Sequence, residues 1–166
     1  MPIFRFGAWL LVAVAHAPML FSTQALTLEE LQADAKLTPA TFLAHFSDFG
    51  FKLRGNTQSP ELFLSSKAGD CDDFANLAAI VLKARGYTPR IVVVSLERVT
   101  HVVCYLPETH SYLDYNHRHD RVLVPSDGTL PNIAQSVASS FKSNWYSVSE
   151  VTFNSGIRRF IRTEFQ

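Results

Sequence analysis

Residues 69–75, Gly-Asp-Cys-Asp-Asp-Phe-Ala, constrain this chain more than any other stretch. They predict a loop that turns into a helix, because Asp70 is a good N-cap whose carboxylate can accept the free N–H groups of the first helical turn. Apolar residues then recur at helical spacing and form one stripe. The stripe consists of Phe74, Leu77, Ala78, Val81 and Leu82. Gly86 is expected to end the helix, which is therefore amphipathic and buried along one side.

Cys71 occupies the first turn of this predicted helix. The partial positive charge at a helix N-terminus favours the thiolate, which is the form of cysteine that attacks carbonyl groups. The neighbouring carboxylates of Asp70, Asp72 and Asp73 oppose this effect. A reactive cysteine at this position therefore requires a nearby cation, most simply a histidine.

Length and composition predict one domain with a substantial core. The chain has 166 residues, 47% of them hydrophobic, and 13 are Phe. Lys and Arg together number 15, as do Asp and Glu, and there is no basic run. The sequence therefore lacks the charge pattern of a nucleic-acid-binding protein, and we expect no nucleic-acid partner.

Residues 1–25 differ from the rest and have the pattern of a secretory signal peptide. Arg5 precedes an apolar run over residues 9–15, and residues 23–25, Thr-Gln-Ala, offer small residues for cleavage. An uncleaved membrane anchor is the alternative, but His16 and Pro18 interrupt the run before the ~20 residues of a spanning helix. We expect a signal peptide over 1–25, a single domain over 26–166, export to the periplasm or the medium, and no stable membrane insertion after cleavage.

Helical patterns dominate the first half of the domain, and strand patterns dominate the second. This order predicts an α+β fold in which N-terminal helices, including the Cys71 helix, pack on an antiparallel sheet. Helices are expected at 27–35, 38–49, 59–64 and after Asp70, with a weak one at 133–141. Strands are expected at 51–54, 90–96, 101–106, 111–116 and 122–124, with a closing hairpin of 145–153 and 157–165.

Cys71, His101 and Asp114 form a candidate triad. Cysteine chemistry needs a base that takes the thiol proton and a group that orients that base. His101 would begin one strand and Asp114 would lie on the next. Because neighbouring strands are about 4.8 Å apart, the two side chains can form a hydrogen bond if the register matches.

These same residues resemble a known family. The run over 69–75, together with Gly-Tyr at 86–87, Thr-His-Val-Val at 100–103 and Tyr-Leu-Asp at 112–114, is similar to the transglutaminase-like superfamily. The nearest likeness is to its small bacterial cysteine peptidases, and it covers roughly residues 42–116. The resemblance implies a papain-like core with Cys71 as nucleophile, His101 as general base and acid, and Asp114 as its orienter.

The sequence departs from the family pattern just before the Ser-Pro segment at 59–60, where members often carry Trp and this chain has Thr57 and Gln58. Gln58 is a candidate donor to an oxyanion, as a glutamine is in papain-like enzymes. The backbone N–H of Cys71 is the other candidate donor.

The resemblance implies a cysteine-dependent hydrolase or acyltransferase, and the signal-peptide pattern predicts that it is exported. It would act on amide bonds of a peptide or protein substrate through a thioester, without a metal ion or organic cofactor. Two alternatives stay open: a catalytically silent domain that binds an envelope peptide or polysaccharide, and a structural domain with a Cys71–Cys104 disulfide. On a regular strand, residues 101 and 104 point to opposite faces, so if His101 faces the helix then Cys104 faces away from it and packs in the core.

A second polar cluster, composed of His110, His117, His119 and Asp120, is the candidate for a metal site. Arg118 and Arg121 lie within it and would repel a cation. We therefore favour a solvated loop over residues 117–121.

Overall fold

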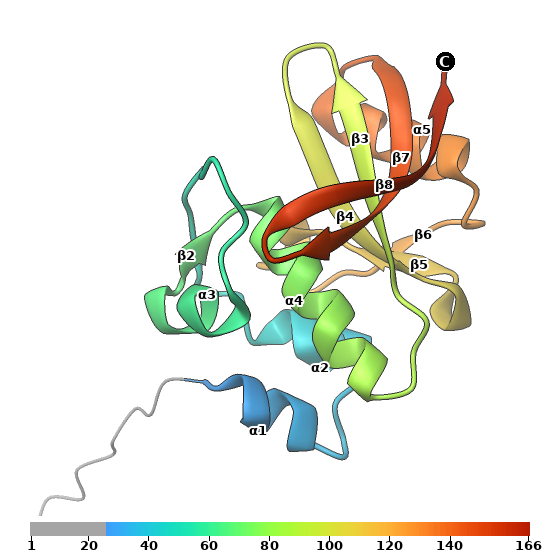
Figure 1. Ribbon diagram of the computed structural model, residues 1–166. Coiled ribbons are helices and arrows are strands. Elements are labelled where there is room, and N and C mark those ends of the chain that lie inside the picture. Colours follow the sequence, from blue (N-terminus) through green and yellow to red (C-terminus); the bar gives the residue numbers. More distant parts are fainter. Residues whose placement is uncertain (1–25) are drawn as a thin grey trace, which may run out of the picture.

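The computed structural model describes residues 26–166, so the predicted signal peptide at 1–25 lies outside the described residues. Four helices precede the main sheet, and Figure 1 shows them gathered on one side of it. They are α1 (Leu28–Ala33), α2 (Pro39–Ala44), α3 (Pro60–Ser66) and α4 (Cys71–Ala84). None of the helices within 26–166 is long and apolar enough to cross a membrane.

Six strands form one sheet in the order β6-β5-β4-β3-β7-β8, and every neighbouring pair is antiparallel. The strands are β3 (Arg90–Leu96), β4 (Thr100–Leu106), β5 (Ser111–Leu113), β6 (Val124–Pro125), β7 (Trp145–Asn154) and β8 (Ile157–Phe165). Two short 3-10 turns flank β5, namely η1 (Pro107–Thr109) and η2 (Tyr115–His117). The predicted α+β class is therefore confirmed.

Helix α5 (Leu130–Phe141) changes the expected topology. It carries the chain from β6 at one edge of the sheet to the opposite side, so that β7 pairs with β3 and the β7–β8 hairpin continues the sheet there. The strands β3 to β6 follow one another as a simple meander, whereas the closing hairpin expected from the sequence joins the sheet on the other side of β3.

Two apolar clusters fill the two faces of the sheet. On one face, α4 packs against Val102, Cys104 and Leu106 of β4. On the other face, α5 packs against Val103 and Tyr105 of the same strand. Alternation along β4 therefore divides its side chains between the two helices.

Phenylalanines from α2, α3 and α4 form the centre of the first cluster. The ring of Phe46 lies 5.2 Å from that of Phe74, and it stacks on Phe63 at a centroid distance of 5.8 Å. All three side chains are fully buried, and burial of each contributes about 1.5–3 kcal/mol. This cluster fixes the first turn of α4 against the N-terminal helices.

Three predicted elements are clearly shorter than the sequence suggested. The strand expected at 111–116 ends at Leu113, and Asp114, which was expected on that strand, instead caps η2. Helix α2 ends at Ala44 instead of residue 49, because the N–H groups of His45, Phe46 and Phe49 donate three residues back and form tight turns. The strand expected at 51–54 contains only β1 (Gly50–Phe51). It pairs in parallel with β2 (Ala68–Gly69), outside the main sheet.

Candidate active site

The start of α4 presents Cys71 at the first helical position. Asp70 caps the helix, since its carboxylate accepts the N–H of Asp72 at 3.1 Å and the N–H of Arg54 at 2.9 Å. Burial raises the pKa of Asp70, while the N–H of Arg54 acts in the opposite direction. The Cys71 side chain is half-buried, so this cap places an accessible thiol at the positive end of the helix dipole.

Asp73 is held by a second set of donors. Its carboxylate accepts the backbone N–H of Asp70 at 3.1 Å and the backbone N–H of Gln58 at 2.6 Å. The side-chain Nε2 of Gln58 also donates to Asp73, at 2.7 Å, and to the carbonyl of Ala68, at 3.0 Å. The amide N–H groups of Gln58 are thus used within the fold, so the expectation that they bind an oxyanion has no support in this arrangement.

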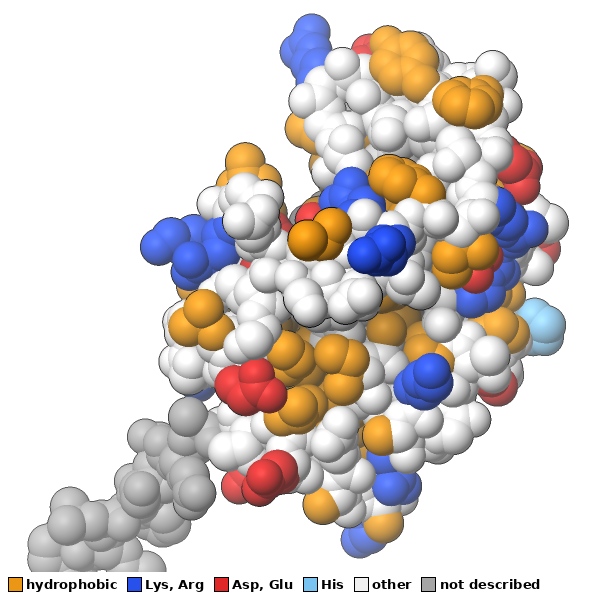
Figure 2. All heavy atoms as spheres, viewed as in Figure 1, with side chains coloured by type: hydrophobic (Ala, Val, Ile, Leu, Met, Phe, Trp, Pro, Cys, Tyr) orange, Lys and Arg blue, Asp and Glu red, His pale blue; other side chains and the backbone are white. Residues whose placement is uncertain are grey.

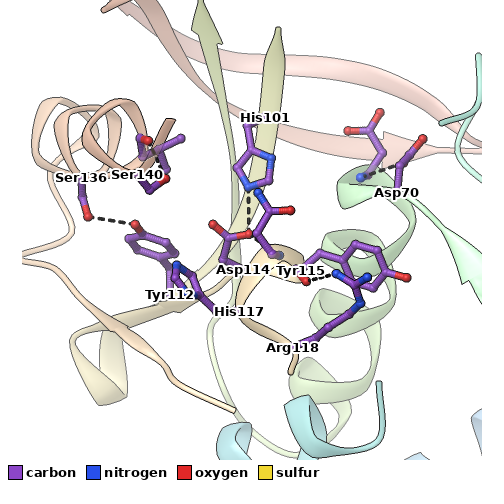
Figure 3. Close-up of polar contacts among 12 residues, drawn as sticks. Asp70, His101, Tyr112, Asp114, Tyr115, His117, Arg118, Ser136 and Ser140 are labelled. Carbon is purple, nitrogen blue, oxygen red and sulfur yellow. Dashed lines mark hydrogen bonds and ion pairs between the residues drawn. The ribbon is translucent and has the colours of Figure 1, made fainter. Parts of the chain in front are cut away.

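His101 and Asp114 meet between β4 and the end of β5. The Nε2 atom of His101 lies 2.9 Å from Oδ1 of Asp114 (Figure 3). Cys104 pairs with Leu113 in this register, so continuing it places Asp114 opposite Val103, two residues from His101 on the same face. The two side chains expose 5% and 1% of their surface, and the pair is therefore shielded from water.

Charge and burial act against each other on this histidine. Burial favours the neutral imidazole, but hydrogen bonds with Asp114 and Cys71, together with their negative charges, outweigh it and raise the pKa of His101 to about 10. Burial also favours the neutral acid at Asp114, yet the hydrogen bond and charge of His101 lower the pKa of that carboxyl. The arrangement therefore favours an imidazolium beside the Asp114 carboxylate.

Cys71 lies close enough to the His101 side chain to act on its pKa. Because Nε2 faces Asp114, Nδ1 is the ring nitrogen left for the thiol. The structure thus pairs His101 with Asp114 and places the first turn of α4, which carries Cys71, near the same histidine.

A family model described as "Transglutaminase-like superfamily" matches residues 44–156. This chain belongs to the transglutaminase-like superfamily. The family predicted from the sequence is thereby confirmed. No curated protein sequence matches the chain.

The fold of this transglutaminase-like chain is also similar to a solved structure, calcium-bound LapG from Legionella pneumophila. The TM-score is 0.51 at 17% sequence identity, and the match covers 81% of this chain and 76% of LapG. At this identity the likeness concerns the fold, and it agrees with the papain-like α+β architecture predicted from the sequence.

Cys104, the second cysteine of the transglutaminase-like domain, is a core residue. It is fully buried, and burial raises the pKa of its thiol to about 12. Both cysteines are free, which contradicts the disulfide alternative. His101 and Cys104 do point to opposite faces of the sheet, as expected. Their faces are exchanged, however: Cys104 lies in the cluster that packs on α4, and the ring of His101 packs 4.9 Å from that of Phe141 in α5.

Arg118 and Tyr115 support the turn that follows Asp114 (Figure 3). The guanidinium of Arg118 lies 4.1 Å from the centre of the Tyr115 ring and donates to the carbonyls of Phe49 and Tyr115, at 2.9 and 2.8 Å. The Tyr115 hydroxyl donates to the carbonyl of Gly50 at 2.9 Å. Arg118 is therefore buried, and the prediction of a solvated loop was wrong at this residue.

Within residues 26–166, no group of three or more His, Cys, Asp or Glu side chains is arranged to hold a metal ion. In the His117 region, Nδ1 of His117 lies 3.9 Å from an oxygen of Asp120, and Asp120 is exposed. Three contributors to the site were missed by the sequence analysis: Phe141, which packs on His101, Arg118, and Arg158, which binds Asp72. No local pattern marks them, because Phe141, Arg158 and the bond of Arg118 to the carbonyl of Phe49 each act across a long sequence separation.

Proposed function

We propose that this chain is a cysteine-dependent hydrolase that cleaves amide bonds in a peptide or protein substrate. The observation that carries the proposal is the buried contact of His101 with Asp114 at 2.9 Å, together with Cys71 at the start of α4, close enough to act on the pKa of His101. Membership of the transglutaminase-like superfamily supports the same chemistry.

In the proposed reaction, His101 holds the proton from Cys71, and the thiolate attacks the carbonyl carbon of the substrate amide. The tetrahedral intermediate collapses when His101 gives its proton to the leaving amine, and a thioester with Cys71 remains. His101 then takes a proton from water, whose oxygen attacks the thioester, and the carboxylic acid leaves as the thiol re-forms. Asp114 keeps the ring oriented and stabilises its positive charge.

The backbone N–H of Cys71 is the proposed donor to the oxyanion. It is one of the N–H groups that the first turn of a helix leaves without an intrahelical acceptor. Such donors stabilise developing negative charge in a tetrahedral intermediate. Gln58 has no part in this proposal because its N–H groups bind Asp73 and Ala68.

LapG is calcium-bound, but the proposal assigns no calcium site to this chain. The carboxylates at the start of α4 already have protein donors: Asp70 and Asp73 accept N–H groups, and Asp72 binds Arg158. Export to the periplasm or the medium is also proposed, and it rests on the pattern of residues 1–25 alone.

Alkylation by iodoacetamide at about pH 6, mapped by mass spectrometry, tests the proposal. An ordinary thiol, with a pKa of about 8.5, is almost wholly protonated at this pH and reacts slowly. We expect rapid labelling of Cys71 that is lost in His101→Ala, with buried Cys104 unlabelled as an internal control. Slow labelling of Cys71 that is unaffected by His101→Ala would contradict the proposal and favour a silent binding domain.

Acyl transfer to an amine is the second candidate, because the same thioester can react with either nucleophile. A primary-amine probe offered together with a peptide substrate distinguishes the two. Incorporation of the probe at a rate above that of hydrolysis would replace the hydrolase by an acyltransferase.

A further inference from the structure

Arg158 links the end of the chain to the residue that follows the candidate nucleophile. Its Nη2 atom lies 3.0 Å from Oδ1 and 2.8 Å from Oδ2 of Asp72, a residue 86 positions away. Both side chains are half-buried, with 28% and 24% exposed. The ion pair therefore joins β8 to the first turn of α4, beside Cys71.

The turn of the β7–β8 hairpin lies against the loop that precedes α3. A Cβ atom added at Gly156, where φ is +74°, would lie 3.0 Å from the carbonyl oxygen of Thr57. Figure 1 shows this turn beside the start of α4, with the hairpin crossing in front of the sheet. A groove of about 320 Å³ runs between loop 55–57, Phe153 and Ile157, and it is lined by both Asp72 and Arg158.

The three carboxylates beside Cys71 are compensated in different ways. Asp70 and Asp73 accept neutral N–H donors from the backbone and from Gln58. Asp72 instead binds a full positive charge. The sequence alone indicated that these acids oppose the thiolate, and the fold supplies a cation at the residue next to it.

Two other charged residues lie near Cys71, and each has its own partner. His101 faces it from β4 and is paired with Asp114. Arg54, on the loop before α3, binds Asp70 through its backbone N–H. If Arg158 were removed, the carboxylate of Asp72, the residue that follows Cys71, would lose its cation, and the negative potential at the sulfur would rise.

We propose that Arg158 is a positioning residue of the Cys71 site: it neutralises Asp72, the residue that follows Cys71, and holds the hairpin turn as one wall of the groove that Asp72 lines. This inference rests on the proposed function. A partly exposed ion pair adds little to the free energy of folding, so its placement is better explained by the thiol beside it than by stability.

The chain offers a matched control on the same strand. Arg159 is exposed and lies across from Thr152, whereas Arg158 lies across from Phe153, so the two arginines point to opposite faces of the sheet. Figure 2 shows Lys and Arg side chains interspersed with hydrophobic ones over this region. Arg159→Gln removes the same charge from β8 without touching Asp72.

The test compares the pH dependence of Cys71 alkylation by iodoacetamide in four proteins: wild type, Arg158→Gln, Arg159→Gln and the double variant Asp72→Asn/Arg158→Gln. We expect Arg158→Gln to slow alkylation at pH 6 by roughly three- to tenfold and to move the curve to higher pH. Arg159→Gln should leave the curve unchanged. The double variant should return to within about twofold of wild type, because no uncompensated carboxylate remains.

Each other outcome overturns the inference in a recognisable way. Wild-type rates in Arg158→Gln would show that the ion pair has no effect on the thiol. Slow alkylation that persists in the double variant would show that Arg158 does not act by neutralising Asp72, and it would overturn the inference. Slow alkylation of the wild type itself would instead overturn the proposed function, which separates the two failures.

Discussion

Nε2 of His101 lies 2.9 Å from Oδ1 of Asp114, and both side chains are almost completely buried. The same carboxylate oxygen accepts the backbone N–H of Asn116 at 2.8 Å. Asp114 thus orients the ring from a fixed position. The contacts between Arg118 and Tyr115 stabilise the turn that follows Asp114. A shielded, oriented imidazole is what the proposed proton transfers require.

Asp114→Asn should keep the shape of the site and remove the charge that stabilises the imidazolium. We expect hydrolysis to fall by about 10²- to 10⁴-fold, with a parallel loss of rapid Cys71 alkylation at pH 6. Steady-state kinetics on a peptide substrate measure the first effect. Asp120→Asn, which removes an exposed acid near His117, is the control, and equal activity of the two variants would show that Asp114 has no catalytic part.

The pH dependence of stability should report the same pair. Because the pKa of His101 rises from 6.5 to about 10 on folding, its contribution to the free energy of unfolding is complete below about pH 6.5 and is lost as the pH rises through about 10. Folding lowers the pKa of Asp114 from 3.8, so its contribution to the free energy of unfolding is present above pH 3.8 and is lost as the pH falls below that value. Urea unfolding measures this effect: between pH 6 and 10 the free energy of unfolding should decline for wild type and decline much less for His101→Gln. Equal declines in the two proteins would contradict the pairing of His101 with Asp114.

Gln58→Ala should lower stability rather than act selectively on the chemical step. Removing its amide leaves Asp73 short of a buried hydrogen-bond donor, which costs about 1–3 kcal/mol. Thermal unfolding measures this loss. If Gln58 instead served the oxyanion, kcat would fall by about 10²- to 10³-fold without a change in Tm.

Gly69→Ala should disturb the approach to the nucleophile. A Cβ atom at this buried position would lie 2.7 and 2.8 Å from two ring carbons of Phe63, and it would also meet the Asp73 carboxylate. Such overpacking costs about 1–3 kcal/mol, so we expect a lower Tm by calorimetry. Gly55→Ala is the control, because a Cβ there meets no atom within 4 Å; equal melting temperatures would show that the loop before α4 yields easily.

Much of the chain could be predicted because its signals are local. Helix α4 and strand β3 formed where expected. Their signals, which are the cap at Asp70, the apolar stripe of α4 and the β-branched residues of β3, each depend on residues close together in the chain. Helix α2 is an exception, since Phe46 and Phe49 keep the helical spacing but enter the core from tight turns. The spacing of apolar residues predicts which side chains are buried. It does not by itself specify which hydrogen bonds the backbone forms.

The family, the fold class and the residue types that can carry the chemistry follow from local signals, because cap, period and motif are properties of neighbouring residues. Which of these residues meet depends on the folded chain. The order of the sheet brings Arg158 to Asp72, and the face of β4 on which His101 lies brings its ring to Phe141. The burial of Arg118 likewise depends on carbonyls of Phe49 and Tyr115. Strand order and register join residues far apart in the chain, and no local pattern specifies that pairing.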